Sequence, residues 1–132
     1  MDRAFSLRFK QIMKFDPDIV RQILLDVESI SAGTFAHDIK LQGQDPDVVI
    51  RHIQILVQEE FIDGRIYLNE FGIASQCTLI DLSYKGHQFL EIARSNTTWN
   101  KAKKSLKEKG IGMTINFLQE ILVKFATSEI SG

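Results

Sequence analysis

Two stretches with apolar residues at helical spacing begin with the same three residues, Asp-Pro-Asp, at positions 16–18 and 45–47. In each, the first aspartate can cap free amide groups, the proline suits the first helical turn, and the second aspartate favours the positive end of the helix dipole. The spacing of the apolar residues predicts two long helices, the first ending at residues 31–33. We interpret the repeat as shared capping chemistry, not as a duplicated module. The apolar positions are Ile19, Ile23, Val27 and Ile30 in the first helix and Val49, Ile53, Leu56 and Val57 in the second.

The segments that follow these helices alternate apolar and polar residues, which predicts strands. Residues 34–42 have the pattern of a short strand, and residues 65–68 and 77–82 form a predicted β-hairpin. Asp63-Gly64 is a turn pair before the hairpin. Three more helices are then predicted: one capped by Ser83, one starting at Asn96 or Thr97 and ended by Gly110, and one capped by Thr114.

This order predicts an α+β, mostly helical fold. It indicates a winged-helix-like core of helix, short strand, helix and β-hairpin wing, with a C-terminal helical extension from about residue 96. The 132 residues suit one domain, which we place at residues 13–132 after an N-terminal extension at 1–12. The single cysteine, Cys77, excludes an internal disulfide framework. With no apolar block of a secretory signal at the N-terminus, we expect a cytoplasmic location and no membrane contact.

The net charge of −1 is unevenly distributed along the chain. Residues 1–15 carry four basic and one acidic residue (+3), residues 16–72 carry four basic and eleven acidic (−7), and residues 73–132 carry eight basic and five acidic (+3). Because the middle of the chain is acidic, it would attract a basic protein surface and repel the phosphate groups of nucleic acid.

Three segments resemble one family: MKFDPDIVRQILL at 13–25, RHIQILVQEEFI at 51–62 and LSYKGHQFLEIARSNTTWNKAKKSLKEKG at 82–110. The family consists of uncharacterised bacterial and phage proteins catalogued as domain of unknown function 2513. The resemblance implies a winged-helix-like fold and residence on prophages or mobile elements, and it supplies no activity and no catalytic residues. Where the family usually has Ala-Gly after the second helix, this chain has Glu59-Glu60, so its turn is expected to close without glycine.

A DNA-reading role would place the second helix in the major groove, where Arg51 and Gln54 could contact base edges. A solvated helix face explains these two side chains equally well. The acidic residues of this segment would also repel phosphate. A lysine run on a later helix is the better footprint for nucleic acid, and its alternative is a solvated face whose lysine stems cover Trp99 and Leu106. The run contains Lys101, Lys103, Lys104, Lys107 and Lys109.

Metal and catalytic sites are not expected from the sequence. The three histidines and Cys77 lack local ligand spacing, and no nucleophile stands beside a base. We therefore predict no enzyme activity, no metal and no cofactor. His52 is predicted to be a hydrogen-bonded structural histidine, Cys77 a buried or inert thiol, Gly86 a site of close packing, and Trp99 a tether for the C-terminal helices.

The last predicted helix carries Ile121 and Val123 beyond its inward stripe, which indicates a homodimer or a protein partner. With the acidic middle of the chain, this favours a non-enzymatic regulatory or adaptor protein that acts through protein contacts. The alternative is a DNA-binding transcriptional regulator that uses the second helix, the wing and the lysine run. The candidate protein interface comprises Asp47, Glu59, Glu60, Ile121 and Val123, and the candidate nucleic-acid contacts are Arg51, Gln54, Lys101, Lys103, Lys104 and Lys107.

Overall fold

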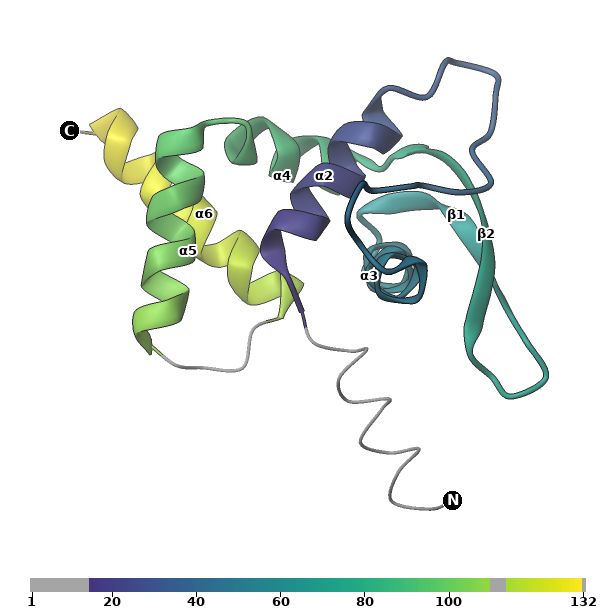
Figure 1. Ribbon diagram of the computed structural model, residues 1–132. Helices are drawn as coiled ribbons and strands as arrows, with labels where there is room; N and C mark the ends of the chain where they lie inside the picture. The colour runs from purple at the N-terminus through teal and green to yellow at the C-terminus, as the bar shows by residue number, and fades with distance from the viewer. Residues whose placement is uncertain (1–14, 110–113, 132) are drawn as a thin grey trace.

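The computed structural model describes residues 15–109 and 114–131, and these form an α+β, mostly helical structure, as predicted. The β1–β2 hairpin lies at one side of the molecule, and α5 and α6 pack together at the other (Figure 1). Helices α2, α3 and α4 lie between them. In chain order the elements are α2 (Pro17–Glu28), α3 (Pro46–Gln58), β1 (Ile62–Leu68), β2 (Ala74–Leu82), α4 (Tyr84–Ala93), α5 (Asn96–Lys109) and α6 (Ile115–Ser131).

The predicted caps begin the helices as expected. The side chains of Asp16 and Asp45 accept the backbone N–H two residues ahead, at 2.9 Å in each case. Ser83 Oγ accepts from the backbone N–H of Gly86 at 3.0 Å at the start of α4. Thr114 Oγ accepts from the N–H of Phe117 at 3.1 Å at the start of α6. Local capping chemistry therefore sets the start of these four helices. Gly110, the predicted end of α5, lies outside the described residues.

The predicted hairpin is confirmed, and its strands are longer than expected. Asp63-Gly64 was expected to form a turn, and that prediction is wrong because both residues lie within β1, at a register shift. A Cβ on Gly64 would stand 2.6 Å from the carbonyl oxygen of Thr78. Glycine is used here for close approach between strands.

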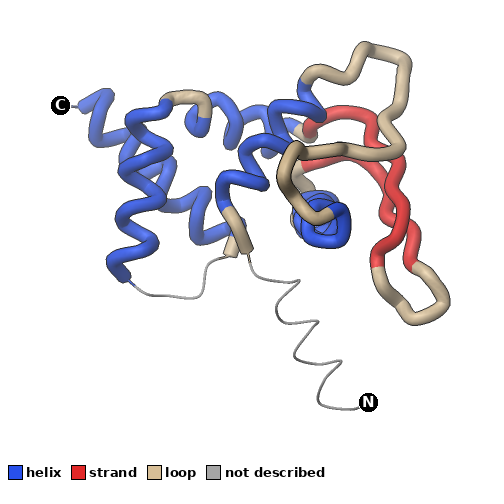
Figure 2. Tube along the Cα trace, in the orientation of Figure 1, coloured by secondary structure: helices blue, strands red, loops and turns tan. Residues whose placement is uncertain are grey.

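The strand predicted at residues 34–42 is reduced to one bridge. Ala36 pairs with Leu79 through two backbone hydrogen bonds of 2.9 and 2.7 Å. The chain then leaves β2 and turns, with the N–H of Gln44 donating to the carbonyl of Leu41 at 3.1 Å. The alternating pattern predicts a strand, but the segment runs as a loop from α2 to α3 (Figure 2).

One hydrophobic core extends from the hairpin to the C-terminal helices. Phe61 packs edge-on against Phe89 with ring centroids 5.5 Å apart, and Phe89 packs against Trp99 at 6.5 Å. Trp99 Nε1 donates to Asp18 Oδ1 at 2.9 Å, which joins α5 to α2. The predicted tether is therefore confirmed.

Candidate functional site

Helix α3 does not expose Arg51, one of the two base contacts that the DNA-binding alternative would use. Arg51 is 5% exposed, and its Nη1 donates to Gln54 Oε1 at 3.0 Å. The prediction that Arg51 contacts DNA is wrong for this structure, because the guanidinium is buried within the chain and occupies the acceptor of Gln54. The formal charge that α3 exposes is therefore acidic, from Asp47 in its first turn.

Glu59, a candidate interface residue, takes part in contacts within the chain. Its Oε2 accepts from Asn116 Nδ2 at 3.1 Å, and its backbone carbonyl accepts from Lys85 Nζ at 3.1 Å. The same ammonium group lies 4.4 Å from the centre of the Phe61 ring. Glu59 thus joins the end of α3 to α4 and α6.

Glu60 closes the turn after α3 with φ at +66°. Its backbone N–H donates to the carbonyl of Val57 at 3.1 Å, and its carbonyl accepts from Ser83 Oγ at 2.5 Å. The turn is closed without glycine, as predicted. The Glu60 carboxylate is exposed and forms no hydrogen bond or ion pair with the described residues.

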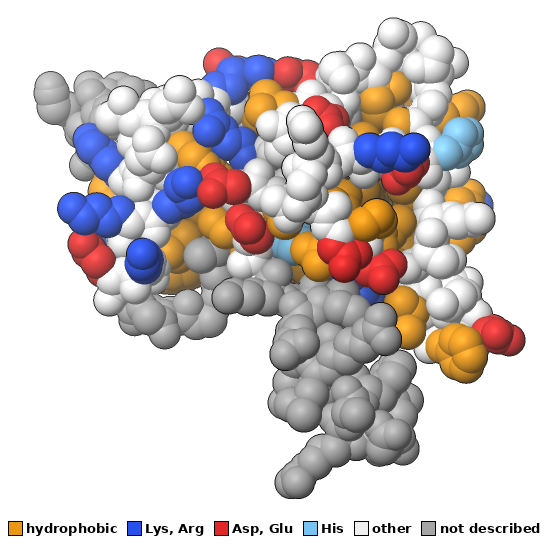
Figure 3. Space-filling model, in the orientation of Figure 1, with side chains coloured by type: hydrophobic (Ala, Val, Ile, Leu, Met, Phe, Trp, Pro, Cys, Tyr) orange, Lys and Arg blue, Asp and Glu red, His pale blue; other side chains and the backbone are white. Residues whose placement is uncertain are grey.

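The lysines of α5 differ in their surroundings. Lys103 Nζ lies 2.9 and 3.1 Å from the two carboxylate oxygens of Asp18, so its charge is paired within the chain. Partial burial raises the pKa of Asp18, but hydrogen bonds from Trp99 and Lys103 outweigh it and hold that pKa below its usual value. Cationic side chains gather over α5 in Figure 3. Among the lysines of this helix whose burial is described, Lys101, Lys104 and Lys107 are exposed.

Helix α6 buries more of its surface than the sequence indicated. Ile121 is 5% exposed and belongs to the core, so its assignment to an intermolecular interface is wrong. The physical reason is that α6 packs against both α4 and α5, which widens its buried face. Val123 is 45% exposed and remains available.

The structural interpretation of His52 is confirmed. The side chain is 1% exposed, and its Nε2 accepts from the backbone N–H of Asp16 at 2.9 Å. Nδ1 therefore carries the proton and donates to the carbonyl of Val48 at 2.8 Å. Burial lowers the pKa of His52 and so favours the neutral ring. The hydrogen bond to Val48 and the charge of Asp16 oppose this shift in part.

Cys77 is buried, as predicted, and burial together with the charge of Asp38 raises the pKa of its thiol to about 11. The thiol is therefore protonated and unreactive at neutral pH. Within residues 15–109 and 114–131, no group of three His, Cys, Asp or Glu side chains could hold a metal ion. No helix in that part of the chain is both long and apolar enough to cross a membrane.

The exposed apolar side chains at the end of the predicted hairpin are a feature that the sequence did not lead us to expect. Asn69 Oδ1 accepts from the N–H of Phe71 at 2.8 Å and from that of Ile73 at 3.1 Å. These bonds fix the turn that contains Phe71, which is 74% exposed. Tyr67 and Leu68, the last two residues of β1, are 44% and 55% exposed beside it. Apolar side chains beside acidic ones are visible at this end of the molecule in Figure 3. The available signal was a run of large apolar residues around the Gly72 turn. We call Tyr67, Leu68 and Phe71 the hairpin tip.

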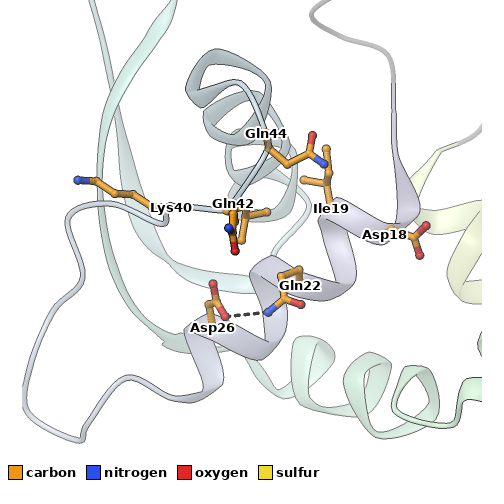
Figure 4. Close-up of a pocket in the computed structure, with 8 residues that line it drawn as sticks. Asp18, Ile19, Gln22, Asp26, Lys40, Gln42 and Gln44 are labelled. Atoms are coloured by element: carbon orange, nitrogen blue, oxygen red, sulfur yellow. Dashed lines mark hydrogen bonds between the residues drawn. The ribbon is translucent and has the colours of Figure 1, made fainter.

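A hollow of about 370 Å³ was also missed; it lies between α2 and the residues that lead into α3 (Figure 4). Asp18, Gln22 and Asp26 line it from α2 at intervals of four residues, which places them on one helix face. Gln22 Nε2 donates to Asp26 Oδ1 at 3.0 Å. That spacing was the signal in the sequence. The other lining residues are Ile19, Lys40, Leu41, Gln42 and Gln44.

Comparison with known proteins gives a family and no activity. The model of the family described as Hypothetical protein (DUF2513) matches residues 14–112. A relative from Haemophilus influenzae (strain ATCC 51907 / DSM 11121 / KW20 / Rd), described as an uncharacterized protein, is 29% identical over 113 residues, which are 83% of this chain and 92% of the relative. No solved structure matches the chain. The family match spans α2 to α5 and so includes the hairpin, the hollow and the lysine helix.

Proposed function

The chain belongs to the family described as Hypothetical protein (DUF2513), and we propose that it is a non-enzymatic regulatory or adaptor protein that acts through protein–protein contacts. The hairpin tip carries this proposal. Its three large apolar side chains are exposed, two at the end of β1 and one in the turn that Asn69 holds by two hydrogen bonds. A rigid apolar surface loses little conformational entropy on binding, and aromatic residues are enriched at interface centres.

The order of α2, α3 and the β1–β2 hairpin supports a winged-helix-like plan in which the hairpin is the wing. In this proposal the wing contacts protein, and α3 serves mainly as scaffold because its arginine is buried. A cytoplasmic setting and an origin on a prophage or mobile element belong to the same proposal, since the single cysteine and the family resemblance favour them.

Site-specific photocrosslinking tests the hairpin tip. A benzophenone amino acid is placed at Phe71, and the chain is irradiated in its own cells. We expect a discrete protein adduct from this position, identified by mass spectrometry. An adduct between two copies of the chain would identify a homodimer as the contact.

Tyr84 supplies the matched control, because it is an aromatic residue of α4 that is 80% exposed. The same label at Tyr84 is expected to give none of the adducts formed at Phe71. The proposal fails if position 71 yields no protein adduct, or if both positions yield the same adducts.

A second candidate function is DNA binding through α5. The observation that favours it is the exposure of Lys101, Lys104 and Lys107 on one helix that has Glu108 as its only formal acid. Fluorescence anisotropy with duplex DNA at low and near-physiological salt tests it. If α5 binds phosphate, Lys104→Ala reduces the slope of log affinity against log salt by about 1. Absence of binding at low salt excludes this candidate.

A further inference from the structure

We propose that the hollow between α2 and residues 40–44 binds the guanidinium group of an arginine in a peptide segment of the protein partner. The inference rests on the proposed function and gives the chemistry of one partner segment. It uses residues separate from the hairpin tip.

The α2 wall offers a carboxylate that is only half used. Gln22 Nε2 donates to one oxygen of Asp26 at 3.0 Å, and no hydrogen bond within the described residues occupies the other oxygen. Asp26 is partly buried and Gln22 is exposed at the surface of the hollow. The bond from Gln22 fixes the carboxylate, which lowers the entropic cost of binding a cation there.

The opposite wall adds neutral acceptors. The side chains of Gln42 and Gln44 come from the segment that leads into α3, and both are exposed (Figure 4). Neither side-chain amide forms a hydrogen bond within the described residues, so both carbonyl oxygens can accept. The half-buried Leu41 and the buried Ile19 provide apolar surface for the aliphatic stem of a ligand.

The distribution of charge selects a cation with several donors. Asp18 already accepts from Trp99 and Lys103, so Asp26 is the available carboxylate of the hollow. Lys40 also lines the hollow, and in Figure 4 its side chain points away from Asp26. A guanidinium has five N–H donors in a plane and can reach acceptors on two walls, whereas an ammonium is a compact point charge.

An NMR titration tests the inference with the whole ¹⁵N-labelled chain and N-acetyl-L-arginine methylamide, which stands for an arginine within a peptide. We expect saturable shifts of the side-chain amide signals of Gln22, Gln42 and Gln44. The corresponding lysine amide should bind at least about threefold more weakly, and the citrulline amide, which has the shape of arginine without its charge, should not saturate. Asp26→Asn should weaken arginine-amide binding about tenfold and preserves the hydrogen bond from Gln22.

Asp38→Asn is the matched control, because Asp38 is an exposed acid of the same loop outside the hollow. Its affinity for the arginine amide should equal that of the unmodified chain. Equal weakening by both substitutions, or equal binding of the arginine and lysine amides, would overturn the site. Tighter binding of free L-arginine than of its amide would overturn the assignment to a peptide. A failed titration with a positive crosslink at Phe71 would reject this inference alone, whereas a failed crosslink would reject the proposed function.

Discussion

Helices α2 and α3 start with the same Asp-Pro-Asp sequence, yet their first turns have different roles. In both, the first aspartate accepts the N–H of the second at 2.9 Å. In α2 the second aspartate, Asp18, also accepts from Trp99 and Lys103 of α5. Its counterpart in α3, Asp47, is exposed and has no side-chain hydrogen bond among the described residues. The same local sequence therefore starts both helices, while the tertiary neighbours decide which carboxylate holds the fold together.

The ends of the two helices differ as well. After α2 the chain turns at Gly33, where φ is +81° and a Cβ would meet no atom within 4 Å. After α3 the chain packs directly against α4, and a Cβ on Gly86 would stand 2.0 Å from the carbonyl oxygen of Phe61. That oxygen also accepts from the N–H of Ser83 at 3.0 Å, so it has little freedom to move. We call the chain after each helix its exit: the exit of α2 is open, because no described atom packs against the Cβ position of Gly33, and the exit of α3 is closed, because Gly86 of α4 packs against Phe61.

Substituting Gly33, which follows α2, and Gly86, the α4 residue that packs against the chain after α3, should give the largest contrast. Gly86→Ala is expected to lower the free energy of unfolding by roughly 3 kcal/mol, because a methyl group is forced against backbone. Gly33→Ala should cost about 1 kcal/mol, from the left-handed backbone alone. Urea denaturation of both variants measures the difference. Equal losses would show that packing at the exit of α3 is as open as at the exit of α2.

Removing the second aspartate of each helix tests the different roles of their first turns. Asp18→Ala should destabilise the fold by about 1–2 kcal/mol, because Trp99 Nε1 loses its acceptor in a buried position. Asp47→Ala should cost about 0.5 kcal/mol, through the helix dipole alone. The urea midpoints, compared at unchanged slope, report both values.

A double-mutant cycle isolates the bond to the indole. In a Trp99→Phe background, Asp18→Ala should cost less than in the unmodified chain, because no indole N–H remains to be left without an acceptor. If the two costs are the same, Asp18 stabilises the fold through Lys103 or the helix dipole and not through Trp99. Its role would then resemble that of Asp47 in α3.

Local signals made much of this comparison predictable from the sequence. The caps at Asp16 and Asp45, the hairpin and the packing role of Gly86 follow from short-range chemistry, and the structure has all of them. Trp99 was also expected to be a tether. A side chain with one clear local or steric requirement can be placed without knowledge of its distant neighbours.

The candidate sites were harder to predict because they depend on contacts distant in sequence. The sequence pattern of α3 predicts a solvent-facing Arg51, but the fold buries it. Lys103 reads as a free cation, but Asp18, 85 residues away, pairs with it. The hollow requires Gln22 and Gln42 to approach from separate segments. The spacing of residues along one helix shows which side chains share a face, and it does not show what covers that face.

The pH dependence of stability tests one link between the N-cap of α2 and α3, the hydrogen bond from the Asp16 N–H to His52 Nε2. Burial lowers the folded-state pKa of His52 from 6.5, so the unfolded chain takes up a proton first as pH falls. The stabilisation is complete above pH 6.5 and is progressively lost as pH falls through the lowered folded-state pKa. Chemical denaturation between pH 8 and 5 should show this loss.

His52→Gln is the control for that titration. The variant should be less stable at pH 8, because the two hydrogen bonds of the ring are replaced imperfectly. Its stability should change less between pH 7 and 5 than that of the unmodified chain. Parallel pH profiles of the two proteins would mean that another group is responsible, and that His52 joins the two helices without sensing protons.

The smallest expected effect is a gain in stability at the exit of α3. Glu60 adopts φ of +66°, where a side chain other than glycine is strained. Both of its backbone hydrogen bonds, to Val57 and Ser83, use groups that glycine also has. Glu60→Gly should therefore raise the free energy of unfolding by about 0.5 kcal/mol, because relief of strain exceeds the greater freedom of glycine in the unfolded chain.

The neighbouring position provides the opposite expectation. Glu59 has φ of −88° and holds Asn116 through its carboxylate, so Glu59→Gly should destabilise the fold by about 1 kcal/mol. Thermal melts of the two variants, measured together, should move in opposite directions. A lower melting temperature for Glu60→Gly would show that the Glu60 side chain contributes to the closed exit of α3. In that case the turn after α3 would depend on the Glu60 side chain as well as on its backbone, which the glycine turn after α2 cannot do.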